Sequence, residues 1–151
     1  MSEPLEFNHH GIRFLYPTNW SVEEEGYLEG KHSVTAYSPT GAFWTVSLHP
    51  RHAEPQGMVE AAVTAMRQEY DSLEWEPYSR GVGEWDLAGA EMHFFYLDLV
   101  CVSRVQAVRT DRGTFVFFCQ AADRDFETLD LVFQALTASC LSHIPKLSYW
   151  E

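Results

Sequence analysis

The chain has 151 residues, of which 46% are hydrophobic and 15% aromatic, and its formal net charge is −12. This composition excludes an intrinsically disordered chain, and the length fits one domain that buries about 68–70% of its unfolded surface. The acidic balance argues against a nucleic-acid partner or an anionic membrane surface, because both require clustered Lys and Arg. It is compatible with a basic protein partner.

The sequence also bears on location and redox state. No apolar run reaches the ~18 residues of a membrane-spanning helix, and the first residues lack the basic and apolar regions of a signal peptide. We therefore expect a cytoplasmic protein.

The three cysteines, Cys101, Cys119 and Cys140, are odd in number and have no CxxC spacing. We therefore expect buried free thiols without a disulfide, metal or catalytic role.

The first third of the chain is expected to consist of strands. Leu5–Phe7 and Ile12–Tyr16 predict a small hairpin, which ends at Pro17 because proline cannot donate a hydrogen bond to a sheet. Trp20 is expected to anchor the core beneath this hairpin. Three further strands are predicted, at Trp20–Glu25, His32–Ser38 and Phe43–His49.

The middle of the chain predicts a helix and then one more strand. From Gly57 to Leu73 the apolar residues recur at helical spacing and form one continuous stripe: Val59, Ala62, Val63, Met66, Tyr70 and Leu73. Trp75–Ser79 and Val82–Trp85 are expected to form another strand, or a strand with a glycine bulge at Gly81 or Gly83. A turn is expected at Asp86–Gly89.

Residues 90–122 are rich in aromatic and β-branched side chains and predict the centre of a sheet. As one strand, Ala90–Arg109 would extend about 68 Å, whereas a compact domain of this length is about 40 Å across. The segment must therefore fold back, which we place between Asp98 and Ser103, and a second turn is expected at Thr110–Gly113. Bulky residues on both faces predict a sheet covered on both sides.

The chain is expected to end in a helix and a tail. Asp123 or Asp125 is expected to cap a helix that extends to about Ser139, with an inward stripe of Phe126, Leu129, Phe133, Leu136 and Cys140. Residues 142–151 are expected to form an aromatic tail. The predicted fold is a single α+β domain over residues 1–151, an antiparallel sheet of about six or seven strands sandwiched by two main helices.

Several of these features together resemble the PsbP-like superfamily. They are a strand ending Tyr16-Pro17-Thr18-Asn19-Trp20, a mid-chain helix, a Gly89-Ala90 step into a long meander, and a last helix with Phe126, Phe133 and Ser139. The superfamily includes the PsbP protein of photosystem II, the Ran-binding import factor Mog and small bacterial proteins, some of which are chaperones or adaptors for secreted effectors. The resemblance implies protein binding and no shared catalytic residues.

The residues that could carry chemistry do not form a recognisable motif. His9 and His10 lie in a turn, and His49 and His52 lie with Glu54 at a strand end, so we expect exposed loop histidines instead of metal ligands. His93 is expected to be a packing residue. Two thiol–histidine sets, Cys140 with His143 and Ser139 and Cys101 with His93, lack a setting that would lower a thiol pKa. We expect no catalytic residues, no cofactor and no metal.

Aromatic and acidic residues point instead to an interaction surface. We expect it among Trp44, Trp75, Trp85, Tyr149, Trp150, Glu23, Glu24 and Glu25. The three glutamates are either an ordinary solvated face or a docking site for a basic partner. The tail either packs on its own sheet, or mediates self-association into a homo-oligomer or the docking of a partner. The expected function is a non-enzymatic adaptor or chaperone-like module, and the alternative is an apolar-ligand pocket between helix and sheet.

Overall fold

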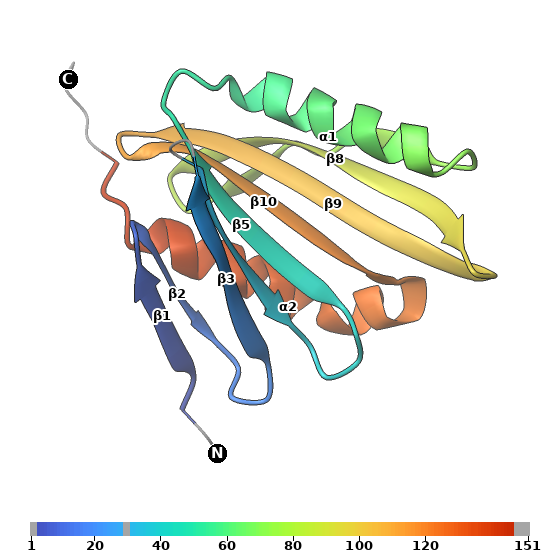
Figure 1. Ribbon diagram of the computed structural model, residues 1–151, viewed down its shortest axis with the longest axis horizontal. Helices are drawn as coiled ribbons and strands as arrows, with labels where there is room; N and C mark the ends of the chain where they lie inside the picture. Colours follow the sequence, from blue (N-terminus) through green and yellow to red (C-terminus); the bar gives the residue numbers. More distant parts are fainter. Residues whose placement is uncertain (1–2, 29–30, 147–151) are drawn as a thin grey trace.

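The computed structural model describes residues 3–28 and 31–146, which form ten strands and two helices (Figure 1). The helices are α1 (Pro55–Glu69) and α2 (Asp123–Ser142). The strands are β1 (Leu5–His9), β2 (Ile12–Tyr16), β3 (Ser21–Leu28), β4 (Lys31–Tyr37), β5 (Phe43–His49), β6 (Glu74–Pro77), β7 (Arg80–Val82), β8 (Trp85–Tyr96), β9 (Leu99–Thr110) and β10 (Gly113–Ala122).

Eight of these strands form one antiparallel sheet in the order β3-β4-β5-β10-β9-β8-β6, with β7 also paired to β8. The hairpin of β1 and β2 forms a separate two-stranded sheet. The predicted α+β class with an antiparallel sheet and two helices is confirmed, but the described sheet has eight strands instead of six or seven. The difference arises because β8 is long enough to pair with both β6 and β7.

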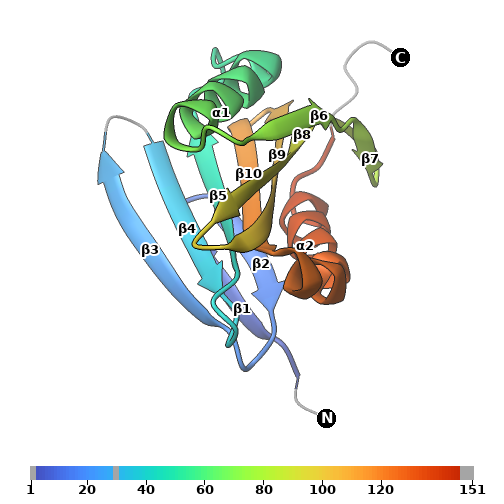
Figure 2. The same ribbon diagram turned by 90° about the vertical axis from the view of Figure 1, so that its right-hand side faces the viewer.

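The two helices cover opposite faces of the sheet (Figure 2), as the bulk on both faces of the central strands predicts. Helix α1 packs its Val59 and Val63 against residues of β8 and β9. Helix α2 packs Phe133 and Leu136 into a larger core that also includes Trp20 and the β1–β2 hairpin. Trp20 is buried and meets Phe133 edge to face, so its predicted role as a core anchor is confirmed.

The helices differ from the prediction at their ends. Helix α1 stops at Glu69, four residues earlier than predicted, because Tyr70 is extended with φ −124°. Helix α2 begins without a side-chain cap, since its N-cap residue is Ala122. Asp123 and Asp125 lie in its first turn, where negative charge complements the helix dipole. No helix in the described part of the chain is long and apolar enough to cross a membrane.

The start of β8 corrects a second prediction. Residues 86–89 are strand and not a turn, and Gly89 lies inside β8. A side chain there is excluded, because a Cβ on Gly89 would stand 2.5 Å from the Tyr78 carbonyl oxygen and 2.8 Å from that of Val105. Gly89 therefore lets its own backbone lie close to the backbones of Tyr78 and Val105, and it does not mark a turn.

Candidate functional site

The structure removes Trp44 from the predicted interaction surface. This side chain is only 1% exposed, and its Nε1 donates a hydrogen bond to Thr137 Oγ1 of α2 at 3.0 Å. Its ring also packs against Phe14 and Phe117. Side chains alternate between the faces of a strand, and Trp44 lies on the face of β5 that α2 covers. Trp44 is therefore a core residue.

The other predicted aromatic residues are not gathered into one surface. Trp75 is exposed and lines a groove between α1 and β6. Trp85 is half-buried and lines a different hollow, near the end of α2, where Lys146 Nζ stands 5.5 Å from its ring centroid. Tyr149 and Trp150 lie outside the described residues, so the role of the tail remains a prediction.

Glu23, Glu24 and Glu25 lie on β3, an edge strand of the main sheet. Charged side chains on an edge strand oppose pairing with another chain. Glu23 and Glu25 are exposed. Glu24 lies against three histidines, and its Oε2 is 2.7 Å from His9 Nδ1. The run is thus mainly a charged edge, and its middle member has a distinct environment.

The sequence does not predict the largest group of exposed apolar side chains among the described residues, which lies at the β8–β9 turn. We call it the apolar tip; its side chains are 38–77% exposed, and they are Phe95, Tyr96, Leu97, Leu99 and Val100. In Figure 1 this turn lies at one end of the long axis of the molecule. The predicted fold-back is confirmed, but it occurs at Leu97–Asp98 instead of between Asp98 and Ser103.

The backbone of the apolar tip is strained. Leu97 and Asp98 have φ values of +51° and +64°, as in a two-residue hairpin turn of type I′. Such positions favour Asn, Asp and Gly, and a bulky side chain with positive φ is an outlier. Leu97 combines this conformation with 77% exposure. A strained, exposed leucine contributes little to folding and therefore suggests a functional reason for its presence.

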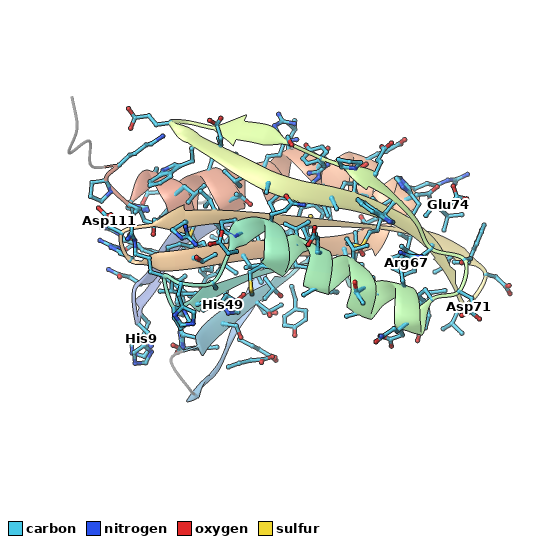
Figure 3. The ribbon with its side chains drawn as sticks, turned by 90° about the horizontal axis from the view of Figure 1, so that it is seen from above. His9, His49, Arg67, Asp71, Glu74 and Asp111 are labelled. Atoms are coloured by element: carbon cyan, nitrogen blue, oxygen red, sulfur yellow. The ribbon has the colours of Figure 1, made fainter. Side chains whose placement is uncertain are left out.

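Acidic residues surround the apolar tip. Asp98 lies in its turn, and Glu74 is paired across the strands with His93. Asp71 precedes Ser72, whose Oγ accepts a hydrogen bond from the Phe95 backbone amide at 3.2 Å. Figure 3 shows Asp71 and Glu74 at this end of the molecule. Figure 3 also places Arg67 of α1 near Asp71, so the acidic residues at this end outnumber the basic one, and they complement an apolar segment flanked by Lys or Arg.

Hollows in the surface differ in size, and the hollow beside Trp85 at the end of α2 has a volume of about 340 Å³. Between the sheet and α2, beside Trp44 and Arg104, the free volume is only about 10 Å³. The groove on the other face, between α1 and β6, is larger at about 200 Å³ and is lined by Val59, Val63, Trp75, Pro77 and Gly89 among others. Drug-sized ligands usually occupy about 300–1,000 Å³.

The cysteines have the environment of structural thiols. All three are free and buried. Burial raises the pKa of Cys119 and of Cys140 to about 12, and it raises the pKa of Cys101 as well. Protonated thiols are poor nucleophiles.

The residues proposed beside these thiols are engaged elsewhere. Ser139 Oγ accepts the Leu15 amide at 2.9 Å, and His143 Nδ1 lies 2.8 Å from the Ser139 carbonyl oxygen. His93, expected as a packing residue, is instead exposed at the end of β8, with Nε2 4.0 Å from a Glu91 oxygen. Neither predicted thiol–histidine set is therefore assembled with an activated thiol.

The second group of histidines does not converge. His49 Nε2 is 2.8 Å from Ser47 Oγ, whereas Glu54 pairs with Arg109 at 3.1 Å. Among the described residues, the one group of three side chains whose ligand atoms could hold a metal ion is His9, His10 and Glu24.

Comparisons with known proteins support the fold. No family model matches the chain, and no curated protein matches it. Among solved structures, a cyanobacterial PsbP protein (CyanoP) from Synechocystis sp. PCC 6803 has a TM-score of 0.58 at 14% identity, with 92% of each chain covered. A Pseudomonas aeruginosa protein of unknown function, PA94, has a TM-score of 0.52 at 8% identity, covering 97% of this chain and 100% of that one.

A crystal structure from Bacteroides thetaiotaomicron has a TM-score of 0.58 at 18% identity and covers 97% of this chain, which spans about half of that protein. At these identities the similarities establish the fold alone, so function has to be argued from the site.

Proposed function

We propose that this PsbP-like protein is a non-enzymatic adaptor or chaperone-like module of the cytoplasm that binds another protein through its apolar tip. The observation that carries the proposal is Leu97, which is 77% exposed at a φ of +51°. Four further exposed apolar side chains lie on the same hairpin, with Phe95 opposite Val100 on one face and Tyr96 opposite Leu99 on the other. Exposed apolar clusters of this kind mark protein–protein interaction sites, and aromatic residues such as Phe95 and Tyr96 are frequent anchors in them.

The charges around the apolar tip define the partner. With a net charge of −12 and with Asp71, Glu74 and Asp98 bordering the cluster, the surface favours a segment with apolar anchors next to Lys or Arg. Charge attraction would accelerate association, and burial of Leu97 and Phe95 would provide most of the affinity. The partner is therefore a basic, amphipathic segment of another protein.

A direct test uses two labelled peptides of equal length, one alternating Leu or Phe with Lys and the other with Glu. We expect the Lys peptide to bind with a measurable change in fluorescence anisotropy, and we expect the Glu peptide not to bind. Leu97→Asp should weaken binding of the Lys peptide at least about tenfold, as for an interface anchor. Raising the salt concentration should also weaken binding of the Lys peptide to the wild-type protein, because salt screens the attraction between the charges.

Leu131 provides the matched control, because it is also 77% exposed but lies on α2. Leu131→Asp should leave the affinity unchanged. A photoreactive phenylalanine analogue at position 97 should crosslink a partner in cells, whereas the same group at position 131 should not. Equal effects at both positions would contradict the proposal. A crosslinked dimer of this chain would mean that the apolar tip binds a second copy of the same protein and not a different partner.

The groove beside Trp75 supports the second candidate, a small apolar-ligand binder. Its volume of about 200 Å³ suits only a small molecule. If this function is correct, an apolar probe should change the Trp75 fluorescence, and Gly89 and Val63 should contact it in a structure. Probe binding that survives Trp75→Phe and Val63→Ala would place the ligand elsewhere.

A further inference from the structure

Four polar side chains that are distant in sequence meet where the small hairpin touches the main sheet. His9 and His10 lie at the β1–β2 turn, Glu24 lies on β3 and His32 on β4. Glu24 Oε2 is 2.7 Å from His9 Nδ1, 3.1 Å from His10 Nδ1 and 2.8 Å from His32 Nε2. The rings are also close, with centroids of His9 and His10 3.8 Å apart and those of His10 and His32 4.8 Å apart.

Backbone geometry directs these side chains to one point. The β1–β2 turn has positive φ at both His10 (+53°) and Gly11 (+85°), so the hairpin reverses within two residues and presents both histidines. In the main sheet, Glu24 pairs with Val34, and His32 lies two residues before Val34 on the same face of β4. The cluster is therefore defined by the registers of two different sheets.

Three imidazole nitrogens meet one carboxylate at this point. All three lie within 3.1 Å of Glu24 Oε2, and His9 Nδ1 also lies 2.9 Å from Oε1. His32 is 2% exposed and approaches the carboxylate from the buried side, whereas the His9 and His10 side chains are 56% and 45% exposed.

We propose that His9, His10 and Glu24 form a binding site for a transition-metal ion of the Zn²⁺ type. The ligand atoms of these three residues all lie within 4.8 Å of one another. Two imidazole nitrogens with one carboxylate oxygen are a common zinc ligand set. Mg²⁺ and Ca²⁺ prefer oxygen ligands throughout, and so they do not suit this site.

The site requires little rearrangement to accept the ion. With metal–ligand distances of about 2.0–2.2 Å, neighbouring ligand atoms in a tetrahedral site stand about 3.3–3.6 Å apart. The two histidine nitrogens would therefore move away from the Glu24 oxygen by less than about 1 Å, and any ligand atoms that now stand up to 4.8 Å apart would close to this spacing. Their side chains are 56% and 45% exposed, which leaves room for this movement and for a water molecule in the fourth position.

His32 is a positioning residue in this proposal. Its Nε2 lies 2.8 Å from Glu24 Oε2 on the buried side, and ligating carboxylates commonly have a polar partner in this position. The metal would also join the β1–β2 hairpin to the edge strand β3. A two-stranded hairpin is marginally stable by itself, so metal binding should stabilise the whole N-terminal part of the fold.

The test is a Co²⁺ titration of the full chain without a histidine tag, followed by absorption, with Zn²⁺ added as competitor. We expect one equivalent of Co²⁺ with the visible bands of a four-coordinate ion, displaced by Zn²⁺. His9→Ala and Glu24→Gln should each weaken binding at least about tenfold. Zn²⁺ should also raise the melting temperature of the wild type and not that of Glu24→Gln.

His52→Ala is the matched control, because His52 is an exposed histidine outside the cluster, and it should leave binding unchanged. His32→Gln should retain the stoichiometry while changing the Co²⁺ spectrum, and circular dichroism without metal would verify its folding. The proposal is overturned by the absence of visible bands, or by binding that His9→Ala and Glu24→Gln leave intact. Binding at millimolar concentrations alone would likewise identify adventitious association with surface histidines.

Discussion

Gly89→Ala is expected to lower the free energy of unfolding by about 3 kcal/mol, because an added methyl group would overlap two backbone oxygens. The new Cβ would stand 2.5 Å from the Tyr78 oxygen and 2.8 Å from the Val105 oxygen. Moving β8 away would also weaken the hydrogen bond from the Tyr78 amide to the Gly89 carbonyl, now 2.9 Å long. Urea unfolding followed by circular dichroism measures the loss.

Gly57→Ala serves as the comparison, since Gly57 lies in the first turns of α1 and its added Cβ would have no neighbour closer than 3.7 Å. Alanine is the better helix former, so this variant should be more stable than the wild type by about 0.5–1 kcal/mol. A similar loss in both variants would show that close packing at Gly89 is not the cause.

Arg104→Met is expected to destabilise the protein by about 3 kcal/mol, because it removes the shared partner of two carboxylates. Arg104 is 5% exposed on β9 and donates hydrogen bonds to Glu91 at 2.9 Å and to Asp130 at 2.7 Å. Its guanidinium also lies over the ring of Tyr78, 4.3 Å from the centroid. The residue thus connects β8, α2 and the segment after β6. Chemical unfolding at pH 7 measures the loss.

The pH dependence of Asp130→Asn tests this assignment separately. Burial raises the pKa of Asp130, but hydrogen bonds from Arg104 and Gln134 outweigh it, and the pKa is lowered overall. A lowered pKa in the folded state means that the ionised carboxylate stabilises the fold above the ordinary Asp pKa of about 3.9 and loses this effect as the pH falls further. Asp130→Asn should therefore cost about 2 kcal/mol at pH 7 and progressively less below pH 4.

Glu127→Gln is the control for this pH series, because Glu127 is an exposed carboxylate on the same helix. Its unfolding free energy should differ from the wild type by less than about 0.5 kcal/mol across the pH range. A cost of Asp130→Asn that stays constant down to pH 3 would mean that the carboxylate stabilises by packing and not by charge.

The candidate sites illustrate where prediction from sequence stops. Phe95, Tyr96 and Leu97 have the composition of a covered strand, and whether they are covered depends on how far α1 and α2 extend along the sheet. Alternation identifies two faces of β5 without saying which one a helix covers, and so the sequence alone does not predict that Trp44 is buried. His9 and Glu24 are 15 positions apart in the chain, and no local spacing rule relates them.

The sequence by itself determined the fold class and most of the helices and strands, because hydrophobic periodicity and turn residues act over short distances. From it follow the inward stripe of α2, most of the stripe of α1, strand β5, the turn after Thr110 and the burial of Cys140. Only the tertiary structure decided which apolar side chains remain uncovered and which polar ones meet. These properties depend on strand register and on the length of packed elements, and both are set by contacts between segments far apart in the chain.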